Sequence, residues 1–260
     1  MNKLKIQFNM KNNFRVGLLS TIDNPLLPFY IDSILSQKIT NIFVICDAKL
    51  ISDKNKDLWF ERTGGVFEQK KNKTGSLYKI NTNPIPFYFV KNHNSKNTEN
   101  LIKLLSIDVL LNAGTPRKLS KLLLTSANYG VVNVHPGSLP EYRGCSAVEW
   151  AIFNDERIIN TAHFMNEEYD QGPIIKNEKY KFSINNNYQD IRVKVYKKGC
   201  LLAGKALKLV LDNKIKPKNG IRQNESKAKY WQPISDDKFK KVIIKINSKS
   251  YKYQKKKPYD

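Results

Sequence analysis

The sequence has little cysteine, no long apolar run and no apolar N-terminal segment, and each absence excludes a class of protein. The three cysteines, Cys46, Cys145 and Cys200, are too few for a disulfide framework and lack the spacing of a zinc site. No run approaches the roughly 20 apolar residues that a membrane-spanning helix needs. Residues 1–13 contain no apolar centre of the kind found in signal peptides. We therefore expect a protein of the reducing cytoplasm that has no membrane partner.

Acidic residues are scarce relative to basic ones. The 23 Asp and Glu residues stand against 45 Lys and Arg, which gives a formal net charge of +22. A charge of this size attracts polyanions, so tRNA is one candidate partner. The lysines are nevertheless scattered, with no compact basic helix and no basic patch interleaved with aromatic residues. A general bias toward Lys and Asn explains the charge as well, and we favour it while keeping both interpretations open.

Strand-like and helix-like segments alternate along most of the chain. Apolar runs predict strands at residues 14–20, 41–47, 86–91, 107–112, 130–134, 161–165 and 172–182. Capping signals and helical spacing predict helices at residues 21–37, 54–64, 97–106 and 188–211. Because the strands are continuous apolar runs between helices, we predict an α/β fold with a Rossmann-like, doubly wound, mostly parallel sheet. In such folds ligands bind at the carboxyl ends of the strands.

The alternation ends near residue 212, and this divides the chain into three parts. We expect an N-terminal tail at residues 1–13, a main domain at residues 14–212 and a short basic extension at residues 213–260. The isoleucines within residues 243–246 predict one strand in the extension.

Two helix starts carry capping signals. Asp23 is expected to cap the first helix, which Pro25 would open. Ser146 and Glu149 have the spacing of a capping box, in which each side chain bonds to the backbone of the other residue. This spacing predicts a short helix that begins at Ser146.

Side chains suited to acid–base chemistry stand at the ends of two predicted strands. Asn133 and His135 lie two residues apart on an extended segment, so both project to the same face. Asp170 follows the strand at 161–165, in a polar loop just before Gly172. An amide, an imidazole and a carboxylate at strand ends together make a general acid–base constellation.

The segment around these residues resembles the catalytic core of the formyltransferases that use 10-formyltetrahydrofolate. The family's pattern is Asn-x-His-Pro-x-x-Leu-Pro, then Arg-Gly, then Trp-Ala-Ile, and then Thr-x-His with an Asp seven residues after that His. The chain has the pattern in register, with Asn133, His135, Pro136, Leu139, Pro140, Arg143, Gly144, Trp150, Ala151, Ile152, Thr161, His163 and Asp170. So many fixed spacings make the match specific. The departures, Gly137-Ser138 for the common Ser-Leu and Ala147 for a common Pro, touch none of the catalytic residue types.

The resemblance implies a formyltransferase in which Asn133, His135 and Asp170 are catalytic. Asn133 would hydrogen-bond the formyl oxygen as it gains negative charge. His135 would manage the proton of the attacking amine, and Asp170 would orient the imidazole and stabilise its cation. His163 is expected to support the site or to pack. His135, His163 and Asp170 also have the residue types of a two-His-one-carboxylate metal site, but the resemblance accounts for them without a metal, so none is expected.

The resemblance also implies the walls of a folate pocket. One wall is the segment Gly114, Thr115, Pro116, Arg117, Lys118, Leu119 and Ser120, which resembles the loop that holds the pterin ring through its backbone. The other wall is the loop of Asn166, Glu167, Glu168 and Tyr169. We suggest Tyr142 and Arg143 as contacts of the second substrate, although Arg143 is equally suited to bonding loop carbonyl groups.

The amine substrate is harder to assign within this family. The first strand-to-helix turn is STIDNP, whereas the related glycinamide ribonucleotide transformylase has a glycine-rich phosphate cradle at that place. We therefore favour an N-formyltransferase, expected to be a homodimer, that acts on a nucleotide-linked 3- or 4-amino-deoxysugar for surface polysaccharides such as lipopolysaccharide.

Two alternatives stay open. The first is a methionyl-tRNA formyltransferase with a truncated C-terminal domain. Residues 223–234, QNESKAKYWQPI, resemble a segment of those enzymes, and the net charge favours a tRNA substrate. The short extension after residue 212 instead favours the sugar enzyme. The second alternative is a catalytically inactive paralogue that binds folate or nucleic acid, against which the intact catalytic residue types argue.

Overall fold

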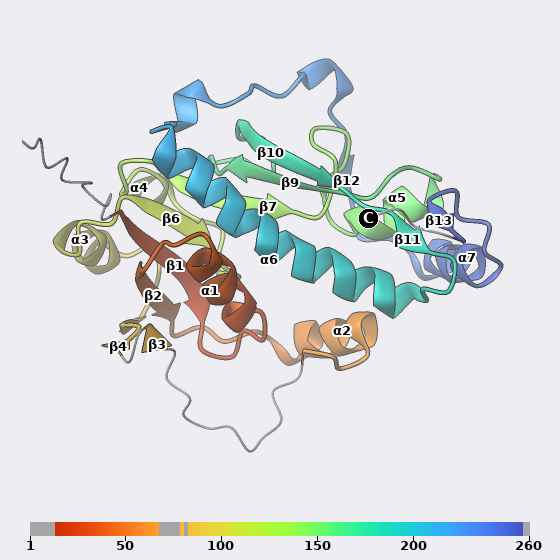
Figure 1. The fold of residues 1–260 in the computed structure, drawn as a ribbon, viewed down its shortest axis with the longest axis horizontal. Helices are drawn as coiled ribbons and strands as arrows, with labels where there is room; N and C mark the ends of the chain where they lie inside the picture. The colour runs from red at the N-terminus through yellow and green to blue at the C-terminus, as the bar shows by residue number, and fades with distance from the viewer. Residues whose placement is uncertain (1–13, 68–78, 81–82, 257–260) are drawn as a thin grey trace, which may run out of the picture.

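The central element of the computed structural model, which describes residues 14–67, 79–80 and 83–256, is a seven-stranded sheet (Figure 1). Its strands, in spatial order, are β10 (Ile174–Lys179), β9 (Ile159–Phe164), β7 (Val131–His135), β6 (Val109–Asn112), β1 (Arg15–Thr21), β2 (Asn41–Asp47) and β5 (Phe87–Val90). The five strands from β7 to β5 are parallel, and β9 runs antiparallel to both of its neighbours. The predicted mostly parallel, doubly wound sheet is confirmed.

Helices cover both faces of this sheet, and short strand pairs lie outside it. The helices are α1 (Leu27–Ser36), α2 (Asp53–Thr63), α3 (Lys96–Leu104), α4 (Lys121–Leu124), α5 (Ala147–Phe153), α6 (Tyr188–Asp212) and α7 (Asp236–Asn247). The pairs are β3 (Lys79–Ile80) with β4 (Asn83–Pro84), β8 (Arg143–Gly144) with β12 (Tyr230–Trp231), and β11 (Phe182–Ser183) with β13 (Gln254–Lys255). The expected tail at residues 1–13 lies outside the described residues.

Alternate residues of the central strands face opposite helical layers. Leu18 packs with Ile31 of α1 and Leu207 of α6, while its neighbour Leu19 packs with Ile102 of α3 and with α4. Figure 1 shows α6 running across β10, β9 and β7 on one face of the sheet, beside α1. Although α6 has 25 residues, no helix in the described part of the chain is long and apolar enough to cross a lipid bilayer. The continuous apolar strands predicted from the sequence are therefore buried on both sides by helices.

The predicted cap of the first helix is wrong, because Asp23 has other partners. Helix α1 begins only at Leu27, and the residue before it makes no side-chain cap. The Asp23 carboxylate instead accepts a hydrogen bond from the Ile51 backbone and pairs with Lys56. Asp23 thus joins the turn after β1 to the start of α2.

The predicted capping box of α5 is also wrong. Ser146 adopts a left-handed backbone conformation (φ 51°), and its hydroxyl makes no bond to the first turn of α5. That hydroxyl accepts a hydrogen bond from the Ile234 backbone instead. Glu149 is fully buried, where its carboxylate lies 3.4 Å from Arg192 Nη1 and accepts a hydrogen bond from the Tyr188 hydroxyl. Tertiary partners therefore outcompete the local cap at both residues.

The strand predicted at residues 243–246 is helical. These residues belong to α7, where Val242 and Ile246 are buried while Ile244 is exposed. Burial four residues apart is the period of a helix, and this face packs against α5. A short run of isoleucines does not distinguish the helical period from the two-residue period of a strand.

Glu149 of α5 and Arg192 of α6 form a buried charge cluster that joins the two helices. Burial alone would raise the pKa of its carboxyl, but the Arg192 and Arg62 guanidinium groups and the Tyr188 hydroxyl hold this pKa below its usual value. Arg192 is itself only 3 % exposed. Removing one member would leave the other as an uncompensated buried charge.

We expect the Glu149→Gln variant to lose roughly 3–5 kcal/mol of unfolding free energy, because Arg192 would keep its burial and lose its counter-charge. Urea unfolding followed by circular dichroism measures this loss. Glu178→Gln is the matched control, since Glu178 pairs with Lys205 at the surface and its removal should cost about 1 kcal/mol or less. Equal stability of the two variants would contradict the buried-pair account.

Candidate active site

The site lies where the strand order of the sheet reverses, beside β1. The turn after β1 and the loop after β6 meet there, because the Asn24 side chain donates hydrogen bonds to Ala113 O and Ser20 Oγ. Gly114, the next residue, has a left-handed backbone conformation (φ 87°), and a Cβ atom on it would lie 2.6 Å from Asn24 Nδ2. This contact between loops fixes the start of the 114–119 segment at the carboxyl ends of the strands, where ligands of such sheets bind.

Asn112, at the end of β6, connects this loop to Asn133. Its Oδ1 accepts hydrogen bonds from the backbone of Gly114 (3.2 Å) and Thr115 (3.0 Å), and its Nδ2 donates to Asn133 Oδ1 (3.0 Å). The sequence prediction missed Asn112. A polar residue that ends a buried strand directly before a Gly-Thr-Pro turn was the available signal.

Asn133 and His163 face each other across β7 and β9, which pair antiparallel at these residues. The Asn133 Nδ2 group donates to His163 Nε2 (3.1 Å), and His163 Nδ1 donates to Phe164 O (2.8 Å). With this assignment every nitrogen meets a partner of the right kind. Burial lowers the pKa of His163 to about 4, against the opposing effect of the Asp170 carboxylate. His163 is therefore neutral near pH 7 and acts as a fixed acceptor for the Asn133 amide.

The Asp170 carboxylate lies between two imidazole rings. Its Oδ1 is 3.4 Å from His135 Nδ1 and 3.8 Å from His163 Nε2, and its Oδ2 accepts a hydrogen bond from Gly144 N (2.9 Å). On the far side of the His135 ring, Nε2 donates to Tyr142 O (2.6 Å), because a carbonyl oxygen can only accept. A neutral His135 thus has its basic nitrogen, Nδ1, directed at Asp170.

A cavity of about 390 Å³ opens beside these residues. It is lined by Asn55, Asn112, Thr115, Pro116, Arg117, Lys118, Leu119, Asn133, His163, Met165, Asn166, Glu167, Glu168, Tyr169 and Asp170. Both loops that the sequence suggested as walls contribute to the lining, although Gly114 and Ser120 do not. Two of the three suggested catalytic residues also line it, while His135 is buried behind Asp170.

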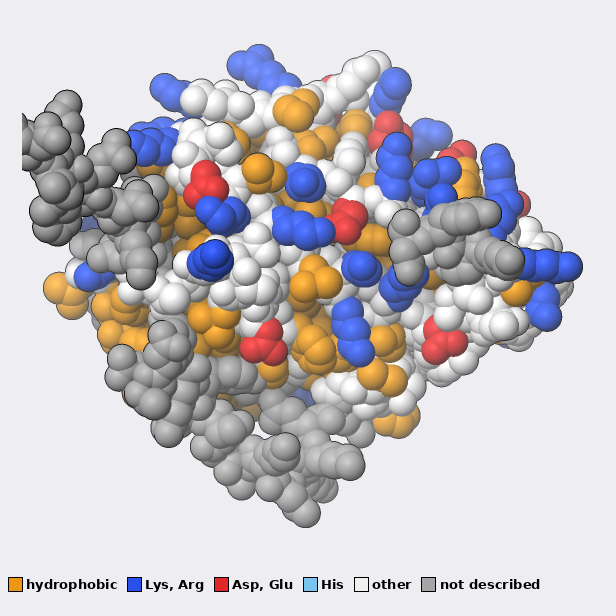
Figure 2. All heavy atoms as spheres, viewed as in Figure 1, with side chains coloured by type: hydrophobic (Ala, Val, Ile, Leu, Met, Phe, Trp, Pro, Cys, Tyr) orange, Lys and Arg blue, Asp and Glu red, His pale blue; other side chains and the backbone are white. Residues whose placement is uncertain are grey.

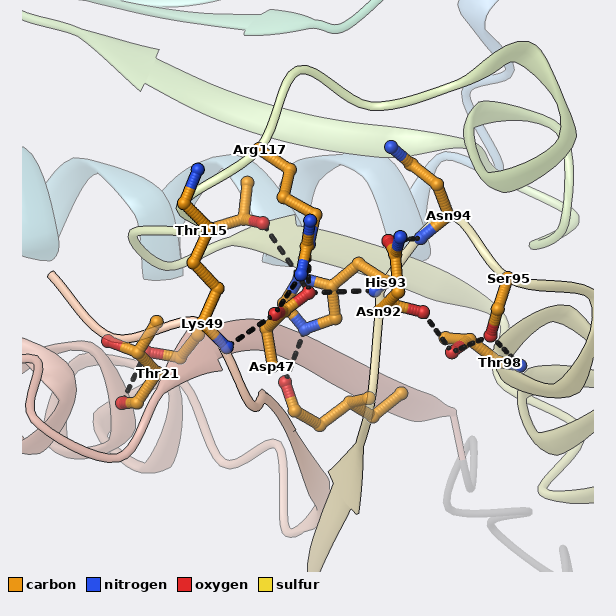
Figure 3. A network of polar contacts seen from close by, with 12 residues as sticks. Thr21, Asp47, Lys49, Asn92, His93, Asn94, Ser95, Thr98, Thr115 and Arg117 are labelled. Carbon is orange, nitrogen blue, oxygen red and sulfur yellow. Dashed lines mark hydrogen bonds and ion pairs between the residues drawn. The ribbon is translucent and has the colours of Figure 1, made fainter.

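Arg117 is tied to the sheet and does not reach freely across the cavity. Its guanidinium donates to both carboxylate oxygens of Asp47 (2.6 and 2.9 Å), which is buried at the end of β2 (Figure 3). Burial alone would raise the pKa of Asp47, but hydrogen bonds from Arg117 and from the Lys49 and His93 backbones lower it. The His93 ring also accepts a hydrogen bond from the Thr115 hydroxyl (2.7 Å), since its other nitrogen bonds to a carbonyl group. The Arg117 and Thr115 side chains of the loop are thereby held by Asp47 and His93.

Tyr142 and Arg143 do not line this cavity. The Tyr142 ring is stacked on Trp231 (5.5 Å between centroids) and borders a second cavity of about 490 Å³. The Arg143 guanidinium is buried and bonds to Gln223 and Glu225. Within residues 14–67, 79–80 and 83–256, no group of three or more His, Cys, Asp or Glu side chains has a geometry that could hold a metal ion.

Comparison with known proteins decides the family. The model of the formyl transferase family matches residues 27–205, which is more than half of the chain. The chain belongs to the formyl transferase family. The family match contains the whole arrangement of Asn133, His135, His163 and Asp170.

One curated relative is a methionyl-tRNA formyltransferase. The chain is 28 % identical over 152 residues to the methionyl-tRNA formyltransferase of Clostridium tetani, covering 58 % of this chain and 48 % of that one. This formyl transferase chain therefore spans about half the length of the curated relatives it matches.

Two solved structures of other proteins share the fold. One is glycinamide ribonucleotide transformylase 1 from Symbiobacterium toebii (TM-score 0.57, 17 % identity, covering 82 % of this chain and 95 % of that one). The other is the N-formyltransferase from Helicobacter canadensis in complex with folinic acid and dTDP-3-aminofucose (TM-score 0.54, 16 % identity, 84 % and 70 %). At these identities the likeness establishes the shared fold.

Stability should fall in acid through His163. The unfolded chain binds a proton on this residue near pH 6.5, whereas the folded protein binds it only near pH 4. Unfolding is therefore favoured as pH falls through this window, by up to about 3 kcal/mol from this residue. Urea unfolding at pH 7.5, 6, 5 and 4.5 measures the slope. A His163→Asn variant, which cannot titrate there, should show a smaller slope, and an identical slope would contradict the assignment.

Proposed function

We propose that the chain transfers a formyl group from 10-formyltetrahydrofolate to a primary amine. The observation that carries the proposal is the cavity in which Asn133, His163 and Asp170 lie between the 115–119 and 166–169 segments. Its volume of about 390 Å³ falls in the range of small-molecule sites. The backbone of the first segment and the Tyr169 side chain would hold the pterin ring, which places the formyl group toward Asn133.

Asn133 is the group suited to stabilise the formyl oxygen. One hydrogen of its amide goes to His163 Nε2, and its oxygen accepts from Asn112, so the amide cannot turn without losing both bonds. The second amide hydrogen has no protein acceptor among the described residues. An uncharged, fixed donor stabilises the oxygen as it gains negative charge and needs no reorganisation during the reaction.

Asp170 and His135 are suited to move the proton. Attack by the amine nitrogen forms a bond to the formyl carbon and leaves positive charge on that nitrogen. Asp170, on the cavity wall, would pass the amine proton to His135 Nδ1, which it faces at 3.4 Å. The resulting imidazolium would lie between the Asp170 carboxylate and Tyr142 O. The same proton would return to the folate nitrogen when its bond to the formyl carbon breaks, so no proton is gained or lost overall.

We expect the Asp170→Asn and His135→Ala variants to lose transfer by roughly 10²- to 10⁴-fold in kcat, since both remove the path of the proton. Both variants should bind a non-reactive folate analogue with an affinity within a few-fold of that of the parent protein, because the backbone of residues 115–119 is unchanged. Single-turnover kinetics and calorimetric titration measure the two quantities separately. Near-normal turnover of His135→Ala would rule out the proposed relay.

For the amine, we propose a nucleotide-linked 3- or 4-amino-deoxysugar destined for a surface polysaccharide such as lipopolysaccharide. The proposal is supported by a structure of the same fold with dTDP-3-aminofucose, whose alignment covers 84 % of this chain. Figure 2 shows Lys and Arg side chains spread across one face, more densely toward its right-hand side, among apolar and a few acidic ones. Such a surface favours a small anionic substrate at least as well as a long polyanion. The homodimer and the cytoplasmic location stay predictions.

The initiator methionyl-tRNA is the second candidate. The curated relative from Clostridium tetani is named for that activity, and the net charge of +22 would favour a polyanion.

A turnover assay with 10-formyltetrahydrofolate separates the two candidates. A panel of nucleotide-linked 3- and 4-amino sugars is offered beside charged initiator tRNA, at two salt concentrations. We expect one sugar to be formylated and the tRNA to remain unmodified. Formylation of the tRNA, with a rate that falls steeply with salt, would replace the sugar proposal. Folate binding with no transfer to any amine would favour the inactive paralogue.

A further inference from the structure

The turn that carries Asp170 is held in an unusual backbone conformation. Asp170 has φ 57°, in the left-handed region that residues with a side chain seldom occupy. Two residues on, a Cβ atom at Gly172 would lie 1.7 Å from Phe164 O, so only glycine fits there. The residues just before Asp170 are exposed. A turn of this kind keeps one shape only if other parts of the chain hold it.

Gln223, which lies 53 residues away in sequence, contacts both ends of this turn. Its Nε2 group donates one hydrogen bond to Asp170 O (2.8 Å) and one to Gly172 O (2.7 Å). Its Oε1 accepts two hydrogen bonds from Arg143, from Nε (3.1 Å) and Nη2 (2.7 Å). Both donors and both acceptor positions of the amide are used, which fixes its orientation. Gln223 also lies beyond residues 27–205, the part that the family model matches.

Arg143 holds Gln223 in place. It is 4 % exposed, and besides Gln223 it bonds to both oxygens of the Glu225 carboxylate. Its backbone belongs to β8, which pairs with β12. Gly144 N, the next backbone group, donates to Asp170 Oδ2. The same dipeptide therefore holds the Asp170 carboxylate directly and the Asp170 main chain through Gln223.

We propose that Gln223 is a positioning residue that sets the place of the Asp170 carboxylate between His135 and His163. This inference rests on the proposed function for its effect on transfer, but the geometric claim stands apart from it. Arg143 is then a support for Gln223, with its guanidinium already occupied, and not a free cation for a substrate phosphate. The segment after α6 thereby contributes to the active site without lining the cavity.

Two substitutions at Gln223 test the proposal. Gln223→Leu removes every hydrogen bond of the side chain. Gln223→Glu keeps the acceptor for Arg143 and the size of the side chain, but has no amide hydrogen for Asp170 O or Gly172 O. Gln232→Leu is the matched control, since Gln232 is exposed on the same segment. Circular dichroism and thermal unfolding establish that each variant is folded.

The first readout needs no activity. The chain has only three histidines, so each ring-proton NMR resonance can be assigned with one substitution. In both Gln223 variants the His135 and His163 resonances should shift, because Asp170 moves relative to their rings. The His93 resonance should stay, since His93 contacts neither Asp170 nor Gln223 in the structure. Gln232→Leu should leave all three in place.

The second readout is transfer. We expect kcat to fall roughly 10- to 100-fold in both Gln223 variants, as a misplacement of about 1 Å at the reacting groups does. The KM for 10-formyltetrahydrofolate should change less than kcat, because Gln223 does not line the cavity. Unmoved His135 and His163 resonances in folded Gln223→Leu and Gln223→Glu would overturn the proposal. If the parent protein formylates no amine, the resonances still decide the positioning role while the proposed function fails separately.

Discussion

The hydrogen bond from Asn133 to His163 is the contact on which the rest of the site depends. It requires that β9 runs antiparallel to β7 in the observed register, because a shift of one residue would turn His163 to the other face. It also requires a neutral imidazole, which burial in the sheet supplies. Through Asn112 the same contact reaches the 114–119 loop. One cross-strand pair thus aligns the amide, the loop and the carboxylate.

The parts of the molecule that sequence predicted well are those determined by local pattern. The strands β1, β2 and β6 lie within about two residues of their predicted bounds because each is a continuous apolar run. The residues of the site were suggested by the family resemblance, because β9 runs antiparallel to β7 and its carboxyl end does not share an edge with that of β7. Parts that depend on distant partners were missed. Ser146 and Glu149 have a capping pattern, but their partners are Arg62 and residues within 188–234, and no local pattern reports such contacts.

Several of the few acidic residues in this basic chain are buried and have structural roles, which the net charge does not indicate. Asp47 is bonded by Arg117, Glu149 by Arg192, and Asp170 by Gly144 N between two imidazoles. Each carboxylate is buried or nearly so, and each has its own donors, as burial of a charge demands. The excess of lysine lies largely outside these clusters, so the overall charge and the chemistry of the site are set by different residues.

The pairing of β12 with β8 has a consequence for the boundaries of the functional unit. A fragment ending with α6 would retain the seven-stranded sheet and every residue that lines the cavity. It would lose the strand beside Arg143 and the amide beside Asp170. Recombination between family members that joined a foreign tail at residue 212 would therefore separate a carboxylate from its support. Inheritance of the site as a whole requires a junction after residue 231, where β12 ends.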